Sequence, residues 1–480
     1  MSGGEIICNF ANDFGRANPE SCSNSLLHHS NNILTLVPAL LIIFVLGYLM
    51  IASEHVLHIN KAVFALIMCG LLWAVYAVNG HDPNLSTDMV EALGDTCEIV
   101  VFLIGAMTIV ELIDRYGGFH IIVENLHASN KRKLMWVLAF VAFFLSSVLD
   151  NMTTTIIMVM MLRRLLSDQK ERWIFACVIV LAANAGGAWS PIGDITTIML
   201  WMKNYVSSVD LIVNLLLPSI VSVIVPVSIA SHMVPATPVE PLNDHDTRVG
   251  YQLSEHHKGL SIFILICGVA GLLFVPVFKA TTHLAPYMGI LLSLGVLWLI
   301  TEILVRYYKL DGKMEGRVSQ VVKNIDMSTI LFFLGILMAV AALSQAGILS
   351  SLAVWLNETF HDVYIINMII GVLSSIVDNV PLVAACMNMY PVATDAMIAA
   401  SVDPAYTMMF VEDGLFWHLL TFCAGVGGSL LIIGSAAGVV AMGIEKIQFM
   451  WYVKRITWLA FIGYLSGIAV IWLESLILNF

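Results

Sequence analysis

The sequence predicts an all-α polytopic membrane protein with two inverted repeats, each of five transmembrane helices, one of them unwound, plus a re-entrant hairpin. Three observations predict this class. Of the 480 residues, 59% are hydrophobic and only 12% charged, whereas soluble domains carry about 25% charged residues. An Asp-Asn motif occurs twice, each time inside a long apolar run. Finally, when the apolar runs are placed across a membrane one after another, nearly all basic residues lie on one side.

The first repeat is predicted at 33–234. A spanning helix needs about 20 mostly apolar residues, and four runs meet this: 33–52, 61–79, 96–114 and 209–232. Between them lies a hairpin, 134–166, whose two arms are too short to cross comfortably. A long run, 173–201, follows it and contains Gly186, Gly187 and Pro191. Because proline and glycine interrupt helices, we expect this span to be unwound at its middle.

The second repeat is predicted at 259–480 and follows the same plan. Its uninterrupted spans are expected at 259–278, 287–306, 327–345 and 457–478, its hairpin at 364–390 and its broken helix at 415–443. A polar stretch, 235–258, is predicted to be a cytoplasmic linker between the repeats. Residues 1–32 are predicted to form an extracytoplasmic tail, in which Cys8 and Cys22 are free to pair or not.

The distribution of basic residues fixes the predicted orientation. Cytoplasmic loops of membrane proteins are enriched in Lys and Arg. Of the 22 Lys and Arg residues, all but Arg16, Lys203 and Lys279 then lie on the cytoplasmic side. Each repeat crosses an odd number of times, so the second repeat is inverted and both termini lie outside. Inverted repeats with broken helices are typical of secondary transporters.

The two motifs support the repeat directly. LSSVLDNMTTT, from Leu145, corresponds to LSSIVDNVPLV, from Leu373. The glycine-broken runs correspond as well, with NAGGAWSPIGD in the first half and GVGGSLLIIGS in the second. A carboxylate inside the bilayer costs at least ~2.5 kcal/mol and marks a functional site by default. The duplicated Asp-Asn pairs are therefore the first candidates for such a site.

The polar groups around these motifs favour a metal cation and a proton as ligands. They are mainly hard oxygen donors, which suit cations such as Na⁺, and we expect no buried Arg or Lys to hold an anion. A buried carboxylate binds either a proton or a cation, so one group suffices for exchange. Asp194 corresponds to Ser435 in the second half. The first half thus has two acidic groups, Asp150 and Asp194, and is predicted to hold the main cation site.

These motifs, LSSVLDNMTTT with NAGGAWSPIGDITTIMLW and LSSIVDNVPL with GVGGSLLIIGSAAG, resemble those of NhaD-type sodium/proton antiporters of the ion transporter superfamily. The resemblance implies exchange of Na⁺ or Li⁺ for H⁺ in a bacterial inner membrane, in the service of pH homeostasis. It also implies a homodimer, with a scaffold domain and a mobile, elevator-type transport domain. The transported ions are substrates, and no resident cofactor or nucleic-acid partner is expected. The implied ion-handling residues, with Thr154 and Ser435 added from the polar pattern, are Asp150, Asn151, Thr153, Asn184, Asp194, Thr196, Asp378 and Asn379.

Several alternatives stay open at this stage. Asp150 and Asp378 are also good helix N-caps. An anion carrier of the same superfamily, for dicarboxylate or arsenite, predicts neutral hairpin tips, which this chain lacks. A channel is a further alternative. An intramembrane aspartyl protease would need a GxGD motif, but Asp194 follows Pro191-Ile192-Gly193, so we predict that the protein is not an enzyme. Glu111 is expected to pair with Arg115 or Lys131 rather than to relay protons.

Overall fold

The computed structural model describes residues 36–51, 53–57, 59–80, 84–119, 121, 128–238, 258–307 and 318–478. Within these ranges all regular secondary structure is helical. Eight of the described helices are long and apolar enough to cross a membrane, and shorter apolar helices accompany them. The predicted class, an all-α polytopic membrane protein, is confirmed. The predicted tail with its two cysteines, and most of the predicted linker, lie outside the described residues.

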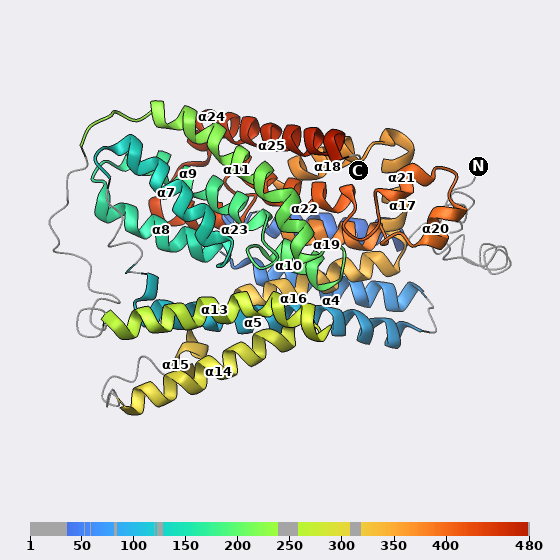
Figure 1. Cartoon of the computed structure of the whole chain (residues 1–480). Coiled ribbons are helices and arrows are strands. Elements are labelled where there is room, and N and C mark those ends of the chain that lie inside the picture. Colours follow the sequence, from blue (N-terminus) through green and yellow to red (C-terminus); the bar gives the residue numbers. More distant parts are fainter. Residues whose placement is uncertain are drawn as a thin grey trace, which may run out of the picture.

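The helices form two bodies, one above the other in Figure 1. The lower body is built from α16, which packs along α4 and against α5, and from α13 and α14, which pack on each other and on α5. Its helices are α4 (Lys61–Gly80), α5 (Leu85–Arg115), α13 (Lys258–Thr282), α14 (Pro286–Tyr307) and α16 (Met327–Gln345), with the short α15 (Val318–Val321) beside them.

The upper body contains two pairs of short helices and two interrupted helices. Its first half comprises α7 (Lys131–Ser146), α8 (Asn151–Leu165), α9 (Gln169–Ala188), α10 (Ile195–Met202) and α11 (Ser208–His232). Its second half comprises α18 (Val363–Ser374), α19 (Asn379–Met389), α22 (Leu415–Gly427), α23 (Ala436–Glu445), α24 (Phe449–Arg455) and α25 (Thr457–Leu478). Helices α11 and α25 pack along each other over the top of this body (Figure 1). The helices α17 (Ile348–Phe360), α20 (Asp395–Ala400) and α21 (Pro404–Met408) lie at one end of the molecule.

The same contacts hold both short-helix pairs against their interrupted helices. At the end of α7, the Ser146 hydroxyl donates to the carbonyl of Ala183 at 2.7 Å. At the end of α18, the Ser374 hydroxyl donates to the carbonyl of Ala424 at 2.8 Å. These approaches require glycine on the interrupted helix. A Cβ on Gly186 would lie 2.1 Å from the Phe143 carbonyl oxygen, and one on Gly427 would lie 2.3 Å from that of Gly371.

Each interruption begins a new helix at a polar N-cap. Helix α9 ends at Ala188, and α10 begins after Asp194, whose side chain accepts from the Thr196 amide. Helix α22 ends at Gly427, and α23 begins after Ser435, whose side chain accepts from the Gly438 amide. Backbone freed inside a membrane protein must be satisfied by other protein groups or by a cavity. The caps, together with the hairpin tips, provide that here.

Ion pairs occur both between helices and within one helix. Glu445, at the end of α23, is 1% exposed and pairs with Arg163 at 2.8 Å and Arg172 at 2.9 Å. Glu111 pairs with Arg115 at 3.0 Å within α5, which is one of the two partners predicted for it. The two arginines match the buried charge of Glu445 and tie α23 to α8 and α9.

Candidate ion-binding site

Both hairpin tips converge on the carboxylate of Asp194. This side chain is 2% exposed and caps α10, with the Thr196 amide donating to Oδ1 at 3.2 Å. The other oxygen, Oδ2, accepts from Asn151 Nδ2 of the first tip at 2.8 Å. It also accepts from Asn379 Nδ2 of the second tip at 3.2 Å. Two residues far apart in the sequence therefore bind one buried acidic group.

Asn184 extends this network into the second half of the chain. It lies near the C-terminal end of α9 and is fully buried. Its Oδ1 accepts from Asn151 at 3.1 Å, and its Nδ2 donates to Ser429 at 2.8 Å and to Ser435 at 2.9 Å. The structure thus joins five of the predicted residues in one hydrogen-bonded network: Asn151, Asn184, Asp194, Asn379 and Ser435.

Asp150 stands beside this network, at the wall of a cavity. It caps α8, and its carboxylate accepts from the Thr153 amide at 2.8 Å and from the Thr153 hydroxyl at 2.6 Å. The cavity has a volume of about 250 Å³ and lies between the two bodies, where α5, α8, α10 and α16 contribute to its wall. Asp150, Asn151 and Thr153 line it, whereas Asp194 is not among the lining residues and is reached through its hydrogen bond with Asn151. A cation in the cavity can therefore contact Asp150 directly.

Asp378 has a different setting, because it pairs with a lysine. Lys61 Nζ lies 3.0 Å from Asp378 Oδ2 and 4.1 Å from the centre of the Phe332 ring. A second cavity, of about 40 Å³, is lined by Asp378, Ser435 and Lys61. The sequence led us to expect no buried Lys or Arg that could hold an anion; Lys61, 23% exposed, does adjoin the site, but its ammonium group is paired with Asp378. Lys61 opens an apolar span, and a basic residue at that position is usually a topological anchor, so nothing in the sequence singled it out.

Two predicted residues, Thr154 and Thr196, are hydroxyls that are 0% exposed near the N-termini of α8 and α10. The Thr196 hydroxyl acts on the Asp194 carboxylate, whereas the Thr154 hydroxyl has no hydrogen-bond partner among the described residues. Buried polar groups of native proteins are nearly always satisfied by protein, water or an ion. The unmatched Thr154 oxygen, on the helix that Asp150 caps, suits an oxygen-coordinated cation or its water.

The wall of the larger cavity also includes two acidic residues that the sequence did not single out, Glu54 and Asp326. Asp326 caps α16 just before the span begins, with Ser328 and Thr329 donating to its carboxylate. Partial burial raises the pKa of Asp326, but these hydrogen bonds outweigh it and hold the pKa below its ordinary value. Among the described lining residues Lys61 is the only basic one, so the cavity as a whole attracts cations.

Comparison with known proteins identifies this chain as a transporter. A family model described as citrate transporter, CitMHS, matches residues 36–411. Sodium/proton antiporter 2 of Arabidopsis thaliana is 41% identical over 89% of this chain and 97% of its own length. The Na⁺/H⁺ antiporter NhaD of Alkalimonas amylolytica is 30% identical, over 90% of each chain. The chain therefore belongs to the CitMHS family of transporters.

A third relative is also named as a sodium/proton antiporter. Sodium/proton antiporter 1 of Arabidopsis thaliana is 42% identical over 90% of this chain and 71% of its own length. Membership of the CitMHS family, with relatives of the NhaD type, confirms the resemblance inferred from the hairpin and broken-helix motifs. It also confirms that the protein belongs with transporters and not with enzymes. The family model and the relatives differ in the substrate they name, so the residues of this chain have to decide between a cation and an anion.

Proposed function

We propose that this CitMHS-family protein exchanges Na⁺ for H⁺ across a membrane. The observation that carries the proposal is the buried carboxylate of Asp194, held by Asn151 and Asn379 from both hairpin tips. The relatives that cover most of the chain are named sodium/proton antiporters. A citrate-like anion would instead need several fixed positive charges, and the cavity wall has three acidic residues against one lysine.

The residues around Asp194 are suited to competitive binding. Asp150 and Asp378 both act electrostatically on Asp194, and this repulsion favours a positive charge bound at Asp194. A proton or a Na⁺ ion relieves this repulsion, and binding of one disfavours the other. Asn151, Asn184 and Asn379 carry both amide donors and a carbonyl oxygen. Each can therefore bond a bare carboxylate with its NH₂ group or turn its oxygen to a cation.

We further propose that the two bodies are a scaffold and a moving transport domain, built from inverted repeats. The recurrence of the Ser146 and Ser374 contacts supports the repeat. With basic loops inside, Glu54, Lys61 and Asp326 lie at the cytoplasmic end of the cavity, which is then open to the cytoplasm. At the other end Lys203 joins the bodies through Asp95 at 2.6 Å and Glu98 at 3.0 Å.

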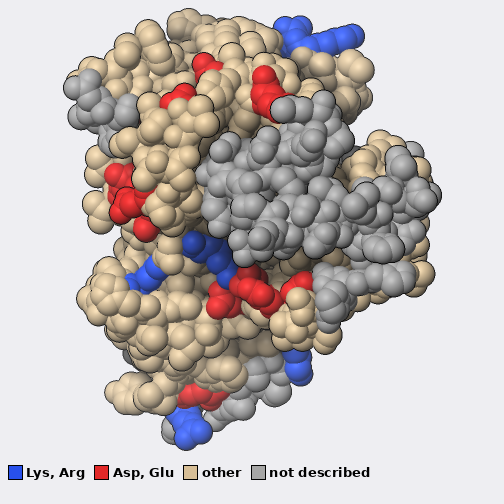
Figure 2. Space-filling model, turned by 90° about the vertical axis from the view of Figure 1, so that its right-hand side faces the viewer, with Lys and Arg blue, Asp and Glu red and all other residues tan. Residues whose placement is uncertain are grey.

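Figure 2 views this opposite face, where Lys or Arg atoms meet Asp and Glu atoms near the level that divides the bodies. Burial lowers the pKa of Lys203, but its hydrogen bonds with Asp95 and Glu98 raise it further, and the pKa ends above its ordinary value. Lys203 thus keeps its charge throughout neutral and moderately alkaline pH. We propose that these ion pairs form a latch that closes the outer side and breaks when the transport domain moves.

Lys61 is proposed to couple that movement to ion binding. It lies in the lower body, whereas Asp378 belongs to the second tip in the upper body. Displacement of the upper body would break the pair, and a Na⁺ ion near Asp378 would compete with the ammonium group. The lysine thereby links occupancy of the site to the position of the transport domain.

The function is tested with everted membrane vesicles in which a pH gradient has been formed. Addition of Na⁺, and by the same chemistry Li⁺, is expected to collapse the gradient, whereas K⁺ has little effect. Asp194→Asn should abolish the response while the protein still inserts. A gradient that responds to citrate or another dicarboxylate, and is indifferent to Na⁺, would contradict the proposal and favour the anion carrier.

Access to the cavity is tested separately with single cysteines. In a cysteine-free background, Val439→Cys lines the cavity and is expected to react with a membrane-impermeant thiol reagent from the cytoplasmic side only. Lys203→Met should release the latch and allow reaction from outside as well. Reaction from the outside in the background carrying Lys203 would contradict the orientation. Residence in a bacterial inner membrane, with both termini outside, and assembly as a homodimer stay predictions, which protease protection and cross-linking would test.

A further inference from the structure

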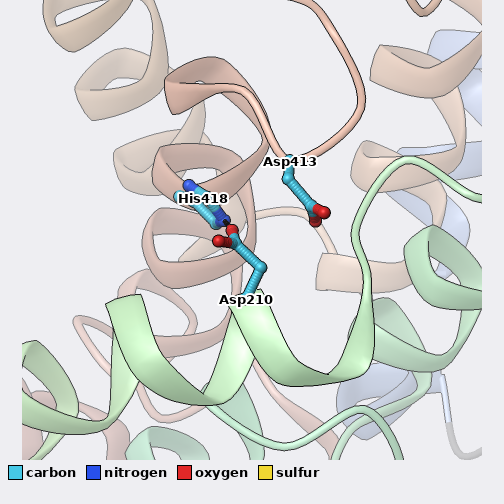
Figure 3. A group of neighbouring side chains, drawn as sticks. All are labelled: Asp210, Asp413 and His418. Atoms are coloured by element: carbon cyan, nitrogen blue, oxygen red, sulfur yellow. Dashed lines mark ion pairs between the residues drawn. The ribbon is translucent and has the colours of Figure 1, made fainter.

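A cluster of three metal-ligating side chains lies apart from the proposed ion path. Asp210 is in the first turn of α11, Asp413 precedes α22, and His418 is in the first turn of α22. Ligand atoms of all three lie within 4.8 Å of one another. In Figure 3 the Asp210 carboxylate points at the His418 ring, and Asp413 descends from the loop toward the same space.

Asp210 and His418 are in close contact, but without the geometry of a hydrogen bond. Asp210 Oδ2 lies 2.6 Å from His418 Nε2, yet neither buried atom has a hydrogen-bond partner of acceptable geometry among the described residues. His418 is only 4% exposed. Buried groups of this kind normally find a partner of good geometry, so a buried imidazole nitrogen directed at the Asp210 carboxylate, with Asp413 within 4.8 Å, indicates a missing ligand.

Asp413 is held in place to serve such a ligand. Its backbone is left-handed, with φ of 61°, and its amide donates to the Tyr205 carbonyl at 3.0 Å. One carboxylate oxygen accepts from the Ser207 amide, which leaves the other oxygen available. Lys279 acts electrostatically on Asp413 from α13, but its ammonium group donates to the Trp201 carbonyl. Among the described residues, Lys279 thus acts on Asp413 only at a distance, and no lysine or arginine is paired with either carboxylate of the cluster.

We propose that Asp210, Asp413 and His418 bind a first-row transition-metal dication of the Zn²⁺ class. Imidazole and carboxylate together suit Zn²⁺ and its neighbours, whereas Ca²⁺ and Mg²⁺ prefer oxygen ligands alone. Bonds of about 2 Å place two ligands of a tetrahedral metal roughly 3 Å apart. The close Asp210–His418 pair and the more distant Asp413 oxygen are both within a small side-chain rotation of that spacing.

Such a metal would clamp the start of α11 to the start of α22 and to the loop before it. On the proposed topology this is the outer end of the transport domain, away from the cytoplasmic end of the cavity with Lys61 and Asp326. The metal would be resident and not transported. It would act on stability and on the rigidity of the outer loop, and this inference stands independently of the transported ion.

The test uses the purified full-length protein in detergent, titrated with Co²⁺ as a coloured probe and then with Zn²⁺. One equivalent of Co²⁺ should give visible absorption bands that Zn²⁺ displaces, and Zn²⁺ should raise the unfolding temperature, because it binds the folded state. His418→Gln and, separately, Asp413→Asn should weaken binding at least ~10-fold. Asp413→Asn keeps the oxygen that accepts from Ser207, so its fold should survive.

Two matched controls define the outcome. His361→Gln removes an exposed histidine that pairs with Asp403 at 3.4 Å, and it should leave Co²⁺ binding unchanged. Asp194→Asn should also leave it unchanged, although it is expected to abolish Na⁺ exchange. Unaltered bands in His418→Gln, or loss of the bands in Asp194→Asn, would overturn the proposal.

Discussion

The tip between α7 and α8 and the tip between α18 and α19 present the same Asp-Asn pair to the centre of the protein in different electrostatic settings. In each tip the aspartate caps a helix and the asparagine bonds Asp194. At the first tip Asp150 receives only neutral donors from Thr153 and faces the larger cavity. At the second tip Asp378 is neutralised by Lys61. The two tips share their helix caps and their asparagine contacts, but their carboxylates have different partners, so we expect different roles for them.

The largest effect is expected at the residue that both tips share. Asp194→Asn removes the acceptor of both asparagines and the buried charge, and should reduce Na⁺-driven collapse of the pH gradient by more than ~100-fold, because the exchange needs a group that takes a proton and a cation in turn. Surface expression and thermal stability serve as controls. Substantial exchange by this variant would show that the tips work independently of each other.

The next prediction separates the tips by their asparagines. Asn151→Ala should raise the half-saturating Na⁺ concentration by about 10-fold and Asn379→Ala by about 3-fold, since losing a hydrogen bond to a charged group costs about 1.5–3 kcal/mol at most and less at a longer distance. Asn151 is closer to Asp194 and also bonds Asn184. Transport assays over a range of Na⁺ concentrations measure both. Equal effects would remove the asymmetry between the tips.

A double-mutant cycle measures the pair that distinguishes the second tip. Lys61→Met alone leaves Asp378 without its cation, and Asp378→Asn alone leaves Lys61 unpaired. The double variant should recover part of the lost transport, with a coupling of about 1 kcal/mol, or a factor of about 5, as expected for contacting partners. Purely additive losses would mean that the ion pair does not contribute to exchange.

A smaller effect is expected at the wall of the cavity beside the first tip. Asp326→Asn should raise the half-saturating Na⁺ concentration by about 2-fold, because it removes one attracting charge that water screens in part. Because the pKa of Asp326 is lowered in the folded protein, its carboxylate is charged at any pH above the ordinary pKa of 3.8. The charge is lost only when the pH falls through the still lower pKa of the folded state. The 2-fold change should therefore be the same at pH 6 and pH 9. A change that grows with pH would identify Asp326 as a titrating group.

The smallest effect tests the framework that the tips have in common. Ser146→Ala and Ser374→Ala each remove one buried hydrogen bond, of 2.7 and 2.8 Å. Each should lower the free energy of unfolding by about 1 kcal/mol, with unchanged half-saturating Na⁺. Thermal unfolding in detergent, followed by a transport assay of the same samples, provides the measurement. Unequal losses would indicate that the two supports are not equivalent.

Much of this arrangement could be predicted from the sequence. Apolar length and the pattern of glycine and proline were enough for the membrane class and for helices that stop near Ala188 and Gly427, because the bilayer restricts backbone to helices wherever it is exposed to lipid. The Asp-Asn pairs were recognisable because charges in such runs are costly. Glu54, Lys61 and Asp326 were not recognisable, since each lies at the end of an apolar run, where charged residues are ordinary.

The amino-acid order alone determined an all-helical membrane protein with duplicated acidic motifs, since periodic apolar runs and their interruptions are local properties of the chain. Only the tertiary structure decided which of these motifs meet. It brought Asn379 to Asp194, Lys61 to Asp378 and His418 to Asp210. Each pair joins residues from distant parts of the chain, and the packing of the helices brings them together.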